Sequence, residues 1–160
     1  MLTAIQTAAL KSIAEASVES EKLTQLPAEL SVAQCIFESA WLTRCPGNNC
    51  FGIKADQHGS GIQYVMTEEY INGMWKKMSL AFEKYDSLAD CFDDHARLII
   101  EEPVYKSAWT QYQQDHNLDA FIKGVAVHYA TAPTYYTAID QMAHTSYVTQ
   151  AIATARSNNA

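Results

Sequence analysis

Apolar residues recur at helical spacing near the start of the chain. Side chains three or four positions apart share one face of an α-helix, and the N-terminal series follows that spacing: Leu2, Ile5, Ala9, Ile13 and Ala16. The pattern resumes over residues 28–41, directly after Pro27. Proline suits the first turn of a helix because its missing N–H is not needed there. The chain therefore begins with two predicted helices, the second of them largely buried.

The pattern changes character in the middle of the chain. Two short runs rich in β-favouring residues, 62–66 and 75–82, lie on either side of Asn72-Gly73. Asn-Gly is a strong hairpin signal because a type I′ turn needs a positive φ at both of its central residues. This region is therefore predicted to form one antiparallel hairpin.

Helical periodicity returns after the hairpin. Asp86 or Ser87 is a candidate N-cap for a helix that ends at Ile100, and this helix has one apolar stripe: Leu88, Cys91, Phe92, His95, Leu98 and Ile99. Further helices are expected at about 103–114 and 117–128, and one longer helix from Pro133 toward Ala155. The sequence thus predicts an α+β fold, mostly helical with one small hairpin, in a single domain over residues 1–160.

Composition narrows the class of partner. The chain has 160 residues, 48% hydrophobic and 18% charged, and its net charge is −7. It has no run of Lys or Arg, so phosphate backbones and anionic lipid surfaces would be repelled. No stretch approaches the roughly 20 apolar residues of a membrane span, and the N-terminus shows a helix rather than an export signal. We expect a monomer whose ligand is neutral or partly cationic, with neither nucleic acid nor membrane as a partner.

Four cysteines allow three disulfide pairings or none. Cys45 and Cys50 are five positions apart around a Pro-Gly turn, a spacing that brings Cα atoms within disulfide range. Cys35 and Cys91 could pair where their helices cross, or they could be small buried apolar residues. Neither Cys-x-x-Cys nor His-Glu-x-x-His spacing occurs, so we expect no metal and no cofactor.

Glu38 stands out among the carboxylates by its surroundings. Helical spacing places it on one stripe with Gln34, Cys35 and Trp41. A low-polarity setting raises a carboxyl pKa because it disfavours the anion, and a general acid near neutral pH needs such a pKa. The alternative is an ordinary solvated glutamate on a helix.

A second pair of carboxylates precedes the predicted turn. Strand alternation sends Glu68 and Glu69 to opposite faces, so one of them can face a cleft, although charged residues near a hairpin tip are usually just solvated. The chain also has 17 aromatic residues, nine of them tyrosine, and tyrosine offers sugars an apolar face and a hydrogen-bonding tip. No nucleophile elbow or phosphate loop occurs, which favours hydrolysis by paired carboxylates.

Five segments, taken in order, resemble successive motifs of the glucosaminidase family, glycoside hydrolase family 73. They are Ala-Gln-Cys-Ile-Phe-Glu-Ser-Ala-Trp at 33–41, Asn-Asn-Cys-Phe-Gly-Ile-Lys at 48–54, Thr-Glu-Glu-Tyr-Ile-Asn-Gly at 67–73, Phe-Glu-Lys-Tyr-Asp-Ser at 82–87 and Tyr-Ala-Thr-Ala-Pro-Thr-Tyr at 129–135. The resemblance implies a lysozyme-like fold, with the hairpin beside an active-site cleft, and cleavage of the β-1,4 bond after N-acetylglucosamine in peptidoglycan. Its glycan strands would be the partner, in the periplasm or the extracellular cell wall.

The resemblance also implies roles for individual residues. Glu38 matches the general acid, Glu69 rather than Glu68 matches the second carboxylate on the hairpin, and Tyr129 matches a tyrosine near the acetamido group. The other candidate substrate contacts are Trp41, Asn49, Phe51, Tyr64 and Tyr135. Trp41 could instead close the core.

The chain departs from the family pattern at several positions. Ala40 and Leu42 stand where the family commonly has glycine, and Glu83 follows Phe82 where arginine is usual. His128 and Ala132 also differ from the usual glycine and acidic residue. None of these changes removes a proton donor. A retaining, an inverting and a substrate-assisted mechanism all stay open, and the rival functions are a lytic transglycosylase or muramidase and a glycan-binding module without turnover.

Overall fold

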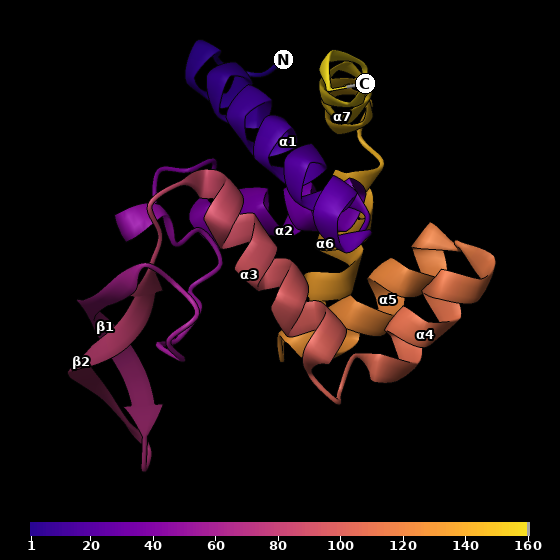
Figure 1. The fold of residues 1–160 in the computed structure, drawn as a ribbon. Helices are drawn as coiled ribbons and strands as arrows, with labels where there is room; N and C mark the ends of the chain where they lie inside the picture. The colour runs from indigo at the N-terminus through magenta and orange to yellow at the C-terminus, as the bar shows by residue number, and fades with distance from the viewer. Residues whose placement is uncertain (160) are drawn as a thin grey trace.

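The computed structural model describes residues 1–159 (Figure 1). Its elements, in chain order, are α1 (Ala4–Thr24), α2 (Ala28–Ser39), the short 3-10 helix η1 (Pro46–Asn48), β1 (Gly61–Ile71), β2 (Met74–Lys84), α3 (Leu88–Glu101), α4 (Lys106–Asp115), α5 (Leu118–Tyr129), α6 (Tyr135–Ala143) and α7 (Ser146–Asn158). The prediction of a mostly helical α+β fold with one hairpin is confirmed. Among the helices of residues 1–159, none is both long and apolar enough to cross a membrane.

The buried side chains form two clusters that meet at α2. The first lies between α1, α2, α7 and the start of α3, and the second lies between α2, the end of α3 and helices α4 to α6. Val32 and Ile36 of α2 belong to the first cluster, whereas Leu30 and Ala33 belong to the second. Because α2 packs on both sides, the segment at its end that includes Glu38 is anchored in both parts of the hydrophobic core.

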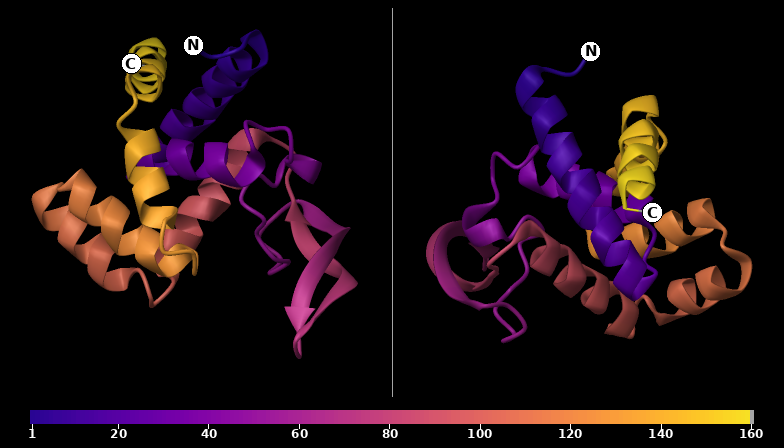
Figure 2. Two further views of the ribbon diagram at one scale, coloured as in Figure 1. Left: turned by 180° about the vertical axis from the view of Figure 1, so that it is seen from behind. Right: turned by 45° about the horizontal axis from the view of Figure 1, so that its top comes forward.

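The predicted long C-terminal helix is wrong, because the chain breaks at His144-Thr145. Ile139 on α6 packs in the second cluster, and Ile152 on α7 packs in the first. One straight helix would not serve both clusters, and α7 instead lies beside α1 (Figure 2). Thr145 has extended backbone angles, φ −64° and ψ 142°, at the start of α7. No proline or glycine marks this break in the sequence.

Helix α2 ends at Ser39, two residues earlier than predicted. Ala40, Trp41 and Leu42 all have a positive φ, of 46°, 61° and 64°. The Ser39 hydroxyl donates to the Cys35 carbonyl at 2.6 Å and accepts the Leu42 N–H at 2.9 Å. Two of the three left-handed positions are those where the family commonly has glycine, which adopts this conformation without steric cost.

The hairpin forms as predicted, with longer strands. Asn72 and Gly73 have φ values of 51° and 79°, as a type I′ turn requires, and the register pairs Glu69 with Lys76 and Gly61 with Lys84. Figure 1 shows the hairpin projecting from the helical body. Among the named elements it packs chiefly against η1.

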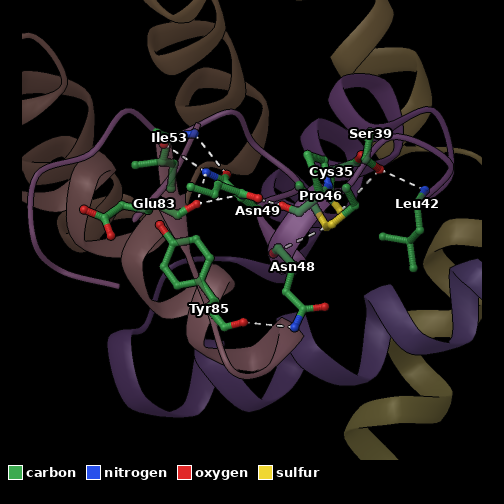
Figure 3. Close-up of a disulfide and its surroundings, with 12 residues drawn as sticks. Cys35, Ser39, Leu42, Pro46, Asn48, Asn49, Ile53, Glu83 and Tyr85 are labelled. Carbon is green, nitrogen blue, oxygen red and sulfur yellow. Dashed lines mark hydrogen bonds between the residues drawn. A yellow bond between two sulfur atoms is a disulfide. The ribbon is translucent and has the colours of Figure 1, made fainter. Parts of the chain in front are cut away.

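The segment between α2 and the hairpin is held by one covalent link and several side chains (Figure 3). Cys45 and Cys50 form the predicted disulfide. The Asn49 side chain donates to the carbonyls of Ile53 and Glu83 and accepts the Ile53 N–H, at 2.9 to 3.0 Å. Asn49 therefore links this segment to the edge of β2 by hydrogen bonds.

Cys35 and Cys91 are both buried and free. The possible disulfide between them is therefore absent from the described residues, and the alternative of two small apolar core residues holds. Burial raises the pKa of the Cys91 thiol to about 12, because a buried thiolate loses its hydration. Such thiols are inert as nucleophiles.

Glu83 organises a second loop. Its buried carboxylate accepts the backbone N–H groups of Asp56, Gln57 and Gly59 at 2.6, 2.5 and 3.0 Å. Asp56 is also tied to α3, since Arg97 Nη2 lies 2.7 Å from Asp56 Oδ2. The base of the hairpin is thus fixed, while the tip is exposed.

Candidate active site

A cavity of about 190 Å³ opens between the end of α2, the disulfide loop and the hairpin. Glu38 comes from the helix, Arg44 and Phe51 come from the loop, and Gln63 and Val65 come from β1. The other lining residues are Pro46, Asn49, Cys50, Gly52 and Phe82. A carboxyl group here faces an apolar surface with a few polar groups, which is the usual composition of a ligand site.

Glu38 is half-buried at the end of α2. Desolvation by burial raises the pKa of its carboxyl group above the ordinary value, and a hydrogen bond from Tyr135 opposes the rise. That bond runs from the Tyr135 hydroxyl to Glu38 Oε1 at 2.8 Å. The predicted low-polarity environment is therefore present, and the carboxyl group has the environment of a general acid.

Aromatic rings form a layer behind this carboxyl group. Tyr129 and Tyr135 stack with ring centroids 5.8 Å apart and an angle of 8° between their planes. The ring of Phe51 stacks on that of His95, with centroids 3.9 Å apart. Phe51 also lines the cavity. Burial raises the pKa of Tyr129 and Tyr135, and the nearby Glu38 carboxylate adds to the effect. Both tyrosines therefore stay protonated and act as hydrogen-bond donors or packing surfaces.

Glu69 lies on the hairpin face that includes Gln63 and Val65, because alternate residues of β1 share a face. Exposure alternates along the strand, with Glu69 partly buried and Glu68 exposed. The Thr67 hydroxyl donates to Glu69 Oε1 at 3.0 Å, and Lys54 Nζ lies 3.9 Å from the same oxygen. The structure thus places Glu69 on the same face of the hairpin as Gln63 and Val65, although Glu69 itself does not line the cavity, and sends Glu68 to the opposite face.

Three further candidates lie in different places. Tyr64 points to the outer face of β1 and is 74% exposed, so the structure does not bring it to the cavity. Trp41 packs against the first core cluster, with its ring 6.2 Å from that of Tyr147. Asn49 lines the cavity, but its side-chain hydrogen bonds all go to the backbone of its own loop and of β2.

Sequence reasoning missed several residues of the site. Arg44 and Gln63 line the cavity, and the Gln63 amide donates to the Pro46 carbonyl at 2.6 Å. Gly47 has a φ of 59°, and a Cβ there would lie 2.7 Å from the Gln63 side chain. Strand alternation places Gln63 on the same face of β1 as Glu69, the carboxylate chosen by the family resemblance, and this was the available signal for Gln63. Arg44 lies in the irregular segment after α2, where no helical or strand periodicity could have indicated the direction of its side chain.

Three ligand-type side chains converge outside the cavity. Asp119, Asp140 and His144 form the one such group of three within residues 1–159. Contacts with the Asp140 carbonyl and the two carboxylates raise the His144 pKa, and His144 Nε2 lies 3.0 Å from Asp119 Oδ1. His144 Nδ1 also lies 3.7 Å from Asp140 Oδ1, so the imidazole contacts both carboxylates.

The fold and the cavity place this chain among glycoside hydrolases of lysozyme-like fold. The Glucosaminidase family model, described as mannosyl-glycoprotein endo-β-N-acetylglucosaminidase, matches residues 14–148. The chain belongs to this family, and the resemblance found in its motifs is confirmed.

Relatives agree with this assignment. The chain is 33% identical over 121 residues to an autolysin of Enterococcus faecalis, an alignment covering 69% of this chain and 16% of the autolysin. It is 29% identical over 143 residues to a probable N-acetylmuramidase of Lactococcus lactis, covering 83% of this chain and 32% of the relative. The chain therefore spans less than half the length of either relative.

A solved structure supports the fold independently. The catalytic domain of the autolysin Auto from Listeria monocytogenes matches with a TM-score of 0.78 and 23% identity, covering 94% of this chain and 89% of that domain. The predicted lysozyme-like arrangement of helices and hairpin is confirmed by this likeness.

Proposed function

We propose that the protein hydrolyses the β-1,4 bond after N-acetylglucosamine in peptidoglycan, with Glu38 protonating the leaving glycosidic oxygen. The observation that carries the proposal is a half-buried carboxyl group of raised pKa in a cavity bordered by a hairpin. A general acid must hold its proton near the working pH, and desolvation supplies that property. Family membership supports the bond type.

Glu69 is proposed as the second carboxylate. It lies on the cavity face of the hairpin, where it can stabilise the positive charge that develops at the anomeric carbon. Carboxyl groups about 5–5.5 Å apart favour a covalent intermediate, and about 6.5–9.5 Å favour attack by water. A third route uses the acetamido oxygen of the substrate, and in that route we propose that Tyr129 orients it. In each route Glu38 keeps the same task.

Peptidoglycan lies outside the reducing cytosol, and we propose that this domain works there as a monomer. The Cys45–Cys50 disulfide supports this location because disulfides persist in oxidising compartments. Named relatives include an autolysin. The substrate is the glycan strand, and the acidic chain agrees with a partner that is not a polyanion such as nucleic acid.

Muropeptide analysis tests the proposal against its rivals. Purified cell walls are digested, and the released fragments are examined by mass spectrometry after borohydride reduction. New N-acetylglucosamine reducing ends are expected. N-acetylmuramic acid ends would indicate a muramidase, the activity named for the Lactococcus lactis relative, and anhydro ends would indicate a lytic transglycosylase.

Variants complete the test. Glu38→Gln keeps the shape of the side chain but has no acidic proton, so we expect cleavage to fall by about 10²-fold or more. Glu19→Gln is the matched control, because Glu19 is an exposed glutamate on α1. Binding to walls without any release by the wild type would instead identify a glycan-binding module, and overturn the proposal.

A further inference from the structure

A chain of hydrogen bonds runs from Glu38 back into the core. The Tyr135 hydroxyl lies 2.8 Å from Glu38 Oε1, Gln34 Nε2 lies 3.2 Å from the Tyr135 hydroxyl, and His95 Nε2 lies 3.0 Å from Gln34 Oε1. Four residues from α2, α3 and α6 are thereby joined. Gln34 and His95 do not line the cavity, and the proposed reaction gives them no part.

The direction of each bond follows from the groups available. Gln34 has one amide group, which donates through Nε2 and accepts through Oε1. With its Nε2 toward Tyr135, the tyrosine oxygen accepts one hydrogen bond and its single hydrogen goes to Glu38. The opposite amide orientation would take the tyrosine hydrogen for Gln34 and leave Glu38 Oε1 without a donor.

His95 fixes the orientation of that amide. Its ring is fully buried, and burial lowers the pKa of His95 to about 3, so the imidazole is neutral at any physiological pH. Its Nδ1 makes no hydrogen bond within residues 1–159. A buried N–H without a partner is rarer than a buried lone pair without one. The hydrogen therefore belongs on Nε2, which donates to Gln34 Oε1.

We propose that Gln34, with its amide held by His95, is a positioning residue that aims the Tyr135 hydroxyl at Oε1 of Glu38. Oε1 is then occupied as an acceptor in both protonation states, and the acidic proton is confined to Oε2. This inference rests on the proposed role of Glu38 as general acid. It assigns a task in that reaction to two core residues that cannot touch the substrate.

Several other titratable or charged groups lie on the elements around Glu38. Tyr129 on α5 and Tyr135 on α6 stay neutral because burial raises the pKa of both. Arg44 shares the cavity with Glu38, and Glu69 with its neighbour Lys54 lies on the hairpin side. His95 stays neutral. The variants below leave all the charged groups in place, so these groups contribute equally to each comparison.

The test measures the pKa of Glu38 directly and by activity. Wild type, Gln34→Met and Tyr135→Phe are titrated by carboxyl ¹³C NMR, with Glu38→Gln used to assign the signal. Losing the donor removes a bond that stabilises the carboxylate, so the Glu38 pKa should rise by about one in Tyr135→Phe. A smaller rise is expected in Gln34→Met. The basic limb of the kcat profile should move to higher pH by the same amounts.

Kinetics separate positioning from binding. Gln34→Met should lower kcat by about tenfold, within the range assigned to proton transfer, and leave KM unchanged because Gln34 is buried away from the cavity. Tyr85→Phe is the matched control: it removes a buried tyrosine hydroxyl that donates to Asp94 at 2.5 Å. That variant should leave the Glu38 pKa unmoved, although it lowers stability.

A double-mutant cycle tests whether Gln34 acts through Tyr135. In Gln34→Met/Tyr135→Phe the Glu38 pKa should equal that of Tyr135→Phe alone, because coupled residues are not additive. If Gln34→Met does not fold, His95→Phe replaces it, since the new ring can keep the stack on Phe51 but lacks the N–H. A wild-type pKa in the folded single variant, or additive shifts, would overturn the inference.

Failure of this inference is distinguishable from failure of the proposed function. If the wild type cleaves peptidoglycan and the variants keep its pH profile and its Glu38 pKa, the positioning role is wrong and the function stands. If the wild type releases no fragments, the proposed function fails, and the NMR titration still decides whether the hydrogen-bond chain controls Glu38.

Discussion

The ammonium group of Lys54 lies 3.9 Å from the Glu69 carboxylate, and this is the one ion pair of Glu69 within residues 1–159. The same ammonium lies 4.3 Å from the centre of the Phe82 ring. Both partners are about half exposed, and exposed ion pairs are worth about 0–1 kcal/mol. The contact therefore neither locks the hairpin in place nor prevents Glu69 from turning toward a bound sugar.

The first prediction contrasts two neighbouring glutamates. Glu69→Gln should reduce wall cleavage by about 10²-fold, because an amide cannot stabilise the charge that develops on the sugar. Glu68→Gln should stay near wild type, since Glu68 faces outward on β1. Release of soluble fragments from purified walls measures both. Equal losses in the two variants would remove the basis for choosing Glu69.

The second prediction concerns pH-dependent stability. The pKa of Glu38 is raised in the folded protein, so the folded state is penalised wherever the carboxylate is ionised. The penalty is absent at pH values below the unfolded pKa of about 4.3, and it is complete above the folded pKa. Glu38→Gln should therefore raise Tm by about 2 °C or more at pH 8, with little change at pH 3.

Calorimetry at both pH values checks that sign. Glu19→Gln, on the exposed face of α1, provides the comparison for a glutamate without such burial. A Glu38→Gln variant less stable than wild type at pH 8 would show that the Tyr135 hydrogen bond outweighs desolvation.

The third prediction concerns the disulfide. Cys45→Ser/Cys50→Ser should lose about 2 kcal/mol of unfolding free energy, from chain-entropy estimates for a loop of this length. Cleavage should fall as well, because Pro46, Asn49 and Cys50 line the cavity. Thiol counting on the denatured, unreduced wild type should find two free thiols. Dithiothreitol should lower the Tm of the wild type and leave that of the double variant unchanged.

The fourth prediction reverses the usual effect of glycine in this region. Ala40 has a φ of 46° at the end of α2, a conformation that costs a residue with a Cβ about 1–2 kcal/mol. Ala40→Gly should therefore stabilise the protein slightly, despite the added freedom of the unfolded chain. Ala153→Gly, at an exposed position inside α7, should destabilise it by about 1 kcal/mol. Urea unfolding of both variants measures the contrast.

Local signals predicted the parts of the fold that depend on local conformation. Asn72-Gly73 predicted the turn. Strand alternation predicted that Glu68 and Glu69 lie on opposite faces of the hairpin, and this is confirmed. The capped third helix begins after Ser87, whose hydroxyl accepts the Asp90 N–H at 3.1 Å. In each case the conformation depends on residues a few positions apart, which the sequence displays directly.

Features that depend on distant packing were not predicted. The break at Thr145 is set by two core clusters whose members come from the whole chain. Tyr64 fits a sugar-binding residue by type, but the register of β1 turns it outward. Gln34 and His95 are 61 positions apart, and no periodic pattern relates an amide on one helix to an imidazole on another.

The loop at residues 56–59 takes its conformation from a residue that is distant in the sequence, Glu83. The shape of that loop is set by one carboxylate on β2, which accepts three of its backbone N–H groups. Every residue except proline has a backbone N–H donor. The conformation of this loop therefore depends largely on Glu83, a residue outside the loop. Within the loop, Gly59 is constrained as well, because a Cβ there would lie 2.5 Å from Glu83 Oε2. One substitution at residue 83 would remove the shared acceptor of all three N–H groups at once.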